Sequence, residues 1–160
     1  MIPPCDFTRK EVLQLQKLIF ERVNEIRKSK GKRPLTYNKG LSRVARYRLY
    51  HMYQDDDFSH IGPNGWSFLH TMNRFGYALP KRGAENLLGT THKPSQGLQT
   101  IAHEMVKAWM SSPPHRRSLL NSAYEITGVG VFMYQRKGHN TTTSSQLFAE
   151  KITRFKPKYS

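Results

Sequence analysis

Cysteine is nearly absent from this sequence, which contains a single such residue, Cys5, among its 160. One thiol cannot form an intrachain disulfide, so the fold must be stable without that covalent link. A chain of this length can bury about 70% of the surface that its unfolded form exposes, which is enough for a core. We therefore expect one domain over residues 1–160, with residues 1–7 as a mobile terminus and Cys5 as an incidental thiol.

Acidic residues are also few: 11 Asp and Glu stand against 26 Lys and Arg, which gives a formal net charge of +15. A field of this sign attracts nucleic acid, anionic lipid or anionic wall polymers. The dense basic run is Arg27–Arg33, and Arg43, Arg46 and Arg48 follow it. Such a run is either a solvated face or a polyanion contact, and no DNA- or RNA-reading motif accompanies it.

Long apolar segments are absent as well. The sequence has no stretch of about 18 apolar residues that could cross a bilayer. It also has no charged region followed by an apolar one, the pattern of a signal peptide. We therefore expect that the chain neither spans a membrane nor carries a signal peptide, and that any export signal was removed before residue 1.

The apolar residues that are present recur at helical spacing. Thr8-Arg9-Lys10-Glu11 has the pattern of a capping box, and the apolar stripe behind it predicts a long helix that ends at Gly31 and Pro34. Trp66 and Trp109 fall on later stripes, so we expect both in the core. Further helices are predicted over residues 41–54, 66–75 and 98–110, with one or two turns over 115–121.

Two runs typical of β-strands close the chain, Ile126–Gln135 and Ser144–Ile152. The polar stretch Arg136–Thr143 between them is typical of a hairpin loop. Helices first and a hairpin last predict an α+β fold.

Three short polar segments lie between the apolar ones, and we interpret them as loop corners. They are Phe58-Ser59-His60, Gly83-Ala84-Glu85-Asn86-Leu87 and Trp109-Met110-Ser111-Ser112-Pro113-Pro114-His115-Arg116. Together with Thr127-Gly128-Val129-Gly130-Val131 downstream, their order resembles the CAP superfamily of cysteine-rich secretory, antigen and pathogenesis-related proteins. The similarity is to its disulfide-free bacterial branch, the SCP-like extracellular domain. It implies a three-layer α-β-α sandwich around a small antiparallel sheet.

In that family a central cleft holds two His and two Glu, which bind zinc or another divalent ion in several members. The resemblance assigns His60 and Glu85 to this cleft, and His115 to the His that the bacterial branch places after its Ser-Pro turn. Imidazole and carboxylate are standard zinc ligands. The resemblance therefore implies that these three side chains converge and could hold a divalent metal, with Glu104 and His139 as further candidates.

The sequence departs from the eukaryotic members at the other two ligands, where Ser111-Ser112 and Thr143 stand. The candidate residues also have structural interpretations, since a His after a Pro-Pro turn can brace a helix and a Glu at a corner can accept backbone amides. Asn86 is expected to stabilise a tight corner by hydrogen bonding to backbone, and Trp109 to be structural.

Three functions follow, in order of preference. The first is a secreted, extracellular, non-enzymatic module whose cleft binds a small ligand, a lipid or an envelope component, because the family is linked to lipid binding without general catalytic activity. The second is a metal-dependent hydrolase or protease, with His60 and His115 on the metal and Glu85 as general base. The third is a basic adhesin for anionic polymers, based on charge alone.

Overall fold

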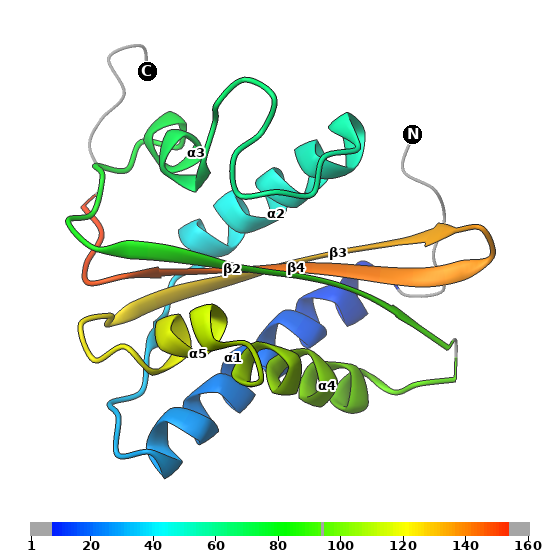
Figure 1. Ribbon diagram of the computed structural model, residues 1–160, viewed down its shortest axis with the longest axis horizontal. Helices are drawn as coiled ribbons and strands as arrows, with labels where there is room; N and C mark the ends of the chain where they lie inside the picture. The colour runs from blue at the N-terminus through cyan, green and yellow to red at the C-terminus, as the bar shows by residue number, and fades with distance from the viewer. Residues whose placement is uncertain (1–7, 94, 154–160) are drawn as a thin grey trace.

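The protein is a three-layer α-β-α sandwich. The computed structural model describes residues 8–93 and 95–153, so Cys5 and the predicted mobile terminus lie outside the described residues. The elements are α1 (Arg9–Ser29), β1 (Thr36–Tyr37), α2 (Lys39–Asp55), α3 (Phe68–Arg74), β2 (Gly83–His92), α4 (Leu98–Met110), α5 (Pro113–Leu120), β3 (Ile126–Arg136) and β4 (His139–Ala149). Helices α2 and α3 lie on one face of the sheet, and α1, α4 and α5 lie on the other (Figure 1).

The sheet has the strand order β1-β3-β4-β2. The three long strands are antiparallel, and the short β1 pairs with β3 in parallel. The central strand β4 is therefore covered on both edges, and β2 is an edge strand. In the register, Glu85 of β2 stands opposite Leu147 of β4.

Local sequence signals explain where the helices begin. At the start of α1, the Thr8 hydroxyl accepts from the Glu11 backbone at 3.2 Å, and the Glu11 carboxylate accepts from the Thr8 backbone at 3.2 Å. The predicted capping box is thus confirmed, and it supplies partners for amides that a helix end leaves unpaired. Helix α4 has the predicted bounds, and α2 extends the predicted range by a residue or two at each end.

The main core lies between β3, α1 and α4. Its largest fully buried side chain is Trp109, whose indole N–H donates to the Leu87 carbonyl at 3.2 Å. This places Trp109 in the core as expected. A smaller apolar cluster lies on the other face, where Leu41, Val44 and Leu147 meet. No helix of the described residues is long and apolar enough to cross a membrane.

Two glycines allow α2 to touch the backbone of β3. A Cβ atom on Gly128 would lie 2.4 Å from the Cβ of Leu41, and one on Gly130 would lie 2.5 Å from the backbone nitrogen of Arg46. Valines 129 and 131 alternate with these glycines and face the main core. The alternation of Gly and Val therefore lets α2 pack closely on one face of β3, while the valines pack into the main core on the other face.

The sheet differs from the sequence prediction in two places. Gly83–Leu87, interpreted as a loop corner, is the first half of β2, because its polar side chains find buried partners that local propensity does not reveal. The hairpin loop is also much shorter than the predicted Arg136–Thr143. Only Lys137 and Gly138 join the strands, both with positive φ, as in the tight turns that suit a twisted hairpin.

Two side chains also differ from their predicted environments. Trp66 is 41% exposed because it lies before the α3 cap residue Ser67, outside the helical stripe. Arg27, in the basic run, is 1% exposed, and its guanidinium donates to the carbonyls of Arg33, Leu119 and Asn121. It therefore does not belong to a solvated face.

Candidate functional site

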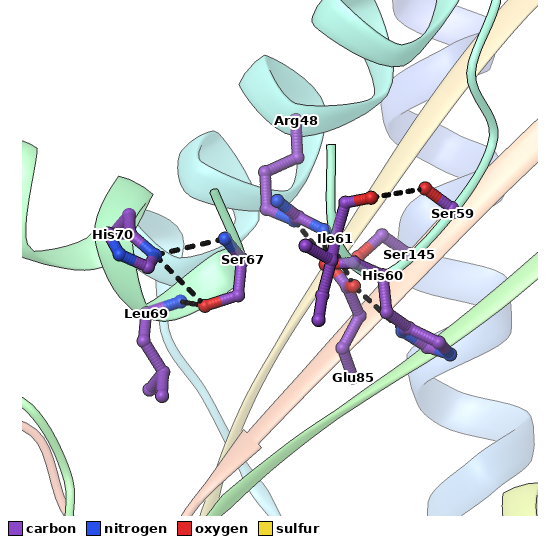
Figure 2. Close-up of polar contacts among 9 residues, drawn as sticks. All are labelled: Arg48, Ser59, His60, Ile61, Ser67, Leu69, His70, Glu85 and Ser145. Atoms are coloured by element: carbon purple, nitrogen blue, oxygen red, sulfur yellow. Dashed lines mark hydrogen bonds and ion pairs between the residues drawn. The ribbon is translucent and has the colours of Figure 1, made fainter. Parts of the chain in front are cut away.

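The site is organised around a buried ion pair between α2 and the edge strand β2. Arg48 Nε donates to Glu85 Oε2 at 2.6 Å, and Arg48 Nη2 donates to Glu85 Oε1 at 2.8 Å. The side chains are 6% and 1% exposed. The arrangement is the bidentate fork that guanidinium and carboxylate groups form most favourably, and Figure 2 shows it at the centre of the site.

The sequence contained a signal for this pair that the basic-run interpretation missed. Arg48 lies four residues after Val44 and three after Ala45, both of which are fully buried on α2. A cation on the buried stripe of a helix requires a buried partner, because charged side chains are almost never fully buried alone. The position of Arg48 in this stripe is a signal for an acidic partner, although it does not indicate which one.

His60 reaches the same carboxylate from the loop between α2 and α3. Its Nδ1 lies 3.0 Å from Glu85 Oε1, and its side chain is 57% exposed. Arg48 Nη2 also donates to the His60 carbonyl at 3.1 Å. On the other oxygen, Ser145 Oγ donates to Glu85 Oε2 at 3.3 Å. Helix, loop and two strands are thus tied to one carboxylate.

His115 approaches from α5, which lies on the opposite face of the sheet. Successive strand residues point to opposite faces, so Glu85 faces α2 while its neighbour Asn86 faces α5, where its side-chain amide donates to the His115 carbonyl at 3.0 Å. Burial first, and the nearby His60 second, lower the pKa of His115 below its usual value. Through this backbone contact His115 is held beside the strand residue that follows Glu85.

Similarity to a known protein family identifies the family of this chain. The model of the cysteine-rich secretory protein (CAP) family matches residues 20–148, most of the chain. The protein belongs to the CAP family. The uncharacterized protein YkwD of Bacillus subtilis (strain 168) is 33% identical to it over 115 residues, which cover 72% of this chain and 41% of YkwD.

Solved structures of bacterial CAP proteins have the same fold. An extracellular protein with an SCP domain from Bacillus anthracis superposes with a TM-score of 0.69 at 23% identity, covering 92% of this chain and 45% of that one. A cysteine-rich secretory protein from Staphylococcus aureus gives 0.63 at 26% identity, covering 92% and 41%. This chain thus spans less than half the length of YkwD and of these two proteins.

The metal site that the resemblance implies does not fit this CAP domain well. Both oxygens of Glu85 already accept from the Arg48 cation, which would repel a metal ion at the same carboxylate. Among the described residues, no three or more His, Cys, Asp or Glu side chains are grouped closely enough to hold a metal ion.

The two further metal candidates lie elsewhere. Glu104, on α4, accepts from the Gln96 amide at 3.2 Å and faces a surface pocket shared with α1. His139 begins β4, directly after the hairpin turn. The structure thus brings His60 and Glu85 into contact, places His115 against the neighbouring Asn86, and leaves Glu104 and His139 apart.

Beside the ion pair, the CAP domain has a pocket of about 200 Å³ between α2, the following loop and α3. Arg48 forms part of its wall, but His60, Glu85 and His115 do not line it. Trp66 and Arg74 contribute from the α3 side, and Tyr47 and His51 from α2. The pocket mixes aromatic faces with charged groups, as small-molecule sites commonly do.

Proposed function

We propose that this protein is an extracellular, non-enzymatic binding module whose ligand enters the pocket between α2 and α3. The observation that carries the proposal is the state of Glu85, whose carboxylate is buried and accepts two hydrogen bonds from Arg48. Such a carboxylate acts as a structural anchor for the pocket wall and the His60 loop. It is not poised for catalysis.

The chemistry of a general base supports this choice. A base must accept a proton from a water or substrate within hydrogen-bond reach. The oxygens of Glu85 instead face Arg48, His60 and Ser145. A hydrolase would have to break the buried pair before Glu85 could accept a proton, and breaking such pairs is costly.

Trp66 supports the pocket as the place where a ligand binds. It is a large aromatic side chain, 41% exposed, and its ring stacks on His70 at 5.7 Å between centroids. Exposed aromatic surface beside a concave pocket is typical of binding sites. With Arg74 and His51 in the same lining, we infer a small ligand that combines an apolar part with polar groups, such as a lipid or envelope component.

The extracellular location is inferred from a relative. The Bacillus anthracis protein is described as extracellular, and we propose the same location for this chain. Detection of the protein in the medium or envelope fraction of its native cells would test this, and its presence only in the cytoplasmic fraction would contradict it.

Ligand binding can be tested with isotope-labelled protein and a fragment set of small aromatic acids, amines and short-chain lipids. We expect the amide signals of Trp66, Thr71 and Arg74 to shift together on titration. Trp66→Ala should weaken the binding at least tenfold, while Leu79→Ala, which removes another exposed apolar side chain, should not. Shifts confined to other surfaces would contradict the proposed pocket.

The metal-dependent alternative requires a separate measurement. We expect calorimetric titration of zinc into metal-stripped protein to show no tight site that depends on both His60 and His115. The variants His60→Ala and His115→Ala test this dependence. A tight one-to-one site that disappears in both variants, accompanied by hydrolysis of a peptide or ester substrate, would favour the hydrolase instead.

A further inference from the structure

A second concave surface lies between α1 and the beginning of α2, and it shares no residue with the Arg48–Glu85 site. It is a groove of about 540 Å³. Five of its lining residues are cations, contributed by both helices and by the N-cap region of α2: Arg9, Lys17, Lys39, Arg43 and Arg46. None of the described residues that line it is acidic.

The charges in this groove are poorly compensated within the described part of the chain. Lys17 has an exposed partner, Glu21, at 3.7 Å. Arg46 donates instead to a neutral group, the Gln16 side-chain oxygen, at 3.3 Å. Burial first, and also the charges of Arg9 and Arg43, lower the pKa of Arg46, while Tyr37 acts in the opposite direction.

Clustered like charges raise the free energy of the folded state, and a bound anion would relieve the repulsion. The cluster is richer in Arg than in Lys, with three guanidinium groups. Guanidinium binds phosphate through a planar fork of N–H donors, which makes Arg the preferred residue for phosphate recognition. Because the cations are spread over two helices, the groove suits a polymer with spaced single negative charges better than one compact anion.

The uncharged lining indicates which kind of phosphate chain fits. Phe20 and Tyr37 pack edge to face at 5.1 Å between centroids, and the Tyr37 hydroxyl hydrogen bonds to Ser42. These rings are already engaged with each other and do not form the open stacking platforms on which single-stranded nucleic acids place their bases. Leu13, 41% exposed, adds an aliphatic surface suited to a polymer backbone.

We propose that the groove between α1 and α2 binds a linear phosphodiester polymer through its backbone, without recognising bases. Arg9, Arg43 and Arg46 contact successive phosphates, and Leu13 packs against the carbon segments between them. The protein would thus hold a polyanion on one face and its pocket ligand on another. This assignment does not depend on the function of the Arg48–Glu85 site.

The test measures binding of a fluorescein-labelled abasic oligonucleotide of about ten phosphodiesters to the whole chain across a salt series. The groove variant is Arg9→Glu with Arg43→Glu, both exposed side chains. The matched control is Lys28→Glu with Lys30→Glu, which changes the net charge equally at the other end of α1. Thermal unfolding checks that both variants remain folded, and Arg46→Gln gives an independent groove variant.

We expect the groove variant to lose at least tenfold in affinity and the control less than twofold. Log affinity should fall less steeply with log salt in the groove variant, by about 0.7 for each phosphate contact removed. A glycerol phosphate oligomer of the same length should bind like the abasic chain. These results together would support the assignment.

Other outcomes would overturn it. Equal losses in the groove variant and the control would indicate attraction by net charge alone. Oligo(dT) that binds more than tenfold tighter than the abasic chain would show that bases are recognised. Binding of phosphatidylglycerol vesicles without binding of the abasic chain would replace the polymer with a membrane, and no binding of any probe at low salt would exclude the site.

Discussion

At the scale of single residues, the Arg48–Glu85 pair has the largest predictable effect on stability. We expect Arg48→Met to lower the free energy of unfolding by about 3–5 kcal/mol, because it leaves a buried carboxylate without its cation. The double variant Arg48→Met with Glu85→Leu should be much closer to the wild type, since a buried apolar pair replaces the ionic one. Urea denaturation at neutral pH measures both.

An exposed ion pair provides the control for this experiment. Arg33 and Glu125 lie 3.1 Å apart with side chains 76% and 55% exposed. Arg33→Met should cost less than about 1 kcal/mol, because solvent screens surface pairs. If Arg48→Met is as mild as Arg33→Met, or if the double variant is as unstable as the single one, the Arg48–Glu85 pair is not a structural anchor.

His115 provides a prediction on pH dependence. Because burial and His60 disfavour its charged form, the unfolded chain binds a proton at a higher pH than the folded one. Its contribution to stability is therefore present above about pH 6.5 and is lost as the pH falls from there toward the lowered folded pKa. His60→Gln should raise the His115 pKa, measured by NMR titration of the imidazole signals.

The control for this titration is His103→Gln, on the exposed face of α4. It should leave the His115 pKa unchanged. A His115 pKa that does not respond to His60→Gln would mean that the two rings are too far apart to share a site.

At the scale of elements, the contact between α2 and β3 depends on glycine. Gly130→Ala should destabilise the fold by about 1–3 kcal/mol or more, because the new Cβ would lie 2.5 Å from the α2 backbone and the helix would have to move. Gly89→Ala, on β2, places its Cβ at an ordinary 3.7 Å from Phe58 and should be nearly neutral. Chemical denaturation measures the free energy of unfolding of both variants. Equal values would contradict the close packing of α2 against β3.

The elements also show where sequence reasoning succeeded. Helices α1, α2 and α4 could be predicted because their apolar residues recur at helical spacing and their ends carry local signals, such as the Thr8 capping box. Strand β2 could not, because Glu85 and Asn86 suit a strand only when Arg48 and the His115 carbonyl are there to pair with them. Those partners are distant in the chain.

At the scale of the whole molecule, the net charge of +15 opposes compactness through self-repulsion. We expect the thermal midpoint of unfolding to rise when salt is increased from about 10 mM to 150 mM, because the screening length shortens from about 30 Å to 8 Å. Scanning calorimetry in sodium chloride measures this. The groove variant of Arg9 and Arg43 should show a smaller increase, and a midpoint that falls with salt would contradict the prediction.

The sequence by itself indicated the family through its short motifs, the three-layer fold through that resemblance, and the extent of the main helices through their apolar spacing and caps. It could do so because helix periodicity, caps and short motifs are local properties of the chain. His60, Glu85 and His115 were identified as candidates from such motifs, and their roles as ligands remain predictions.

Only the tertiary structure decided what each side chain contacts. Arg48 pairs with Glu85, and Arg27 is buried although it belongs to the basic run. Trp66 is exposed beside a pocket, and one groove is lined by Arg9, Arg43 and Arg46. The sequence could not settle these pairings, because each depends on which helix faces which strand. Burial and charge compensation are properties of that packing and not of local spacing.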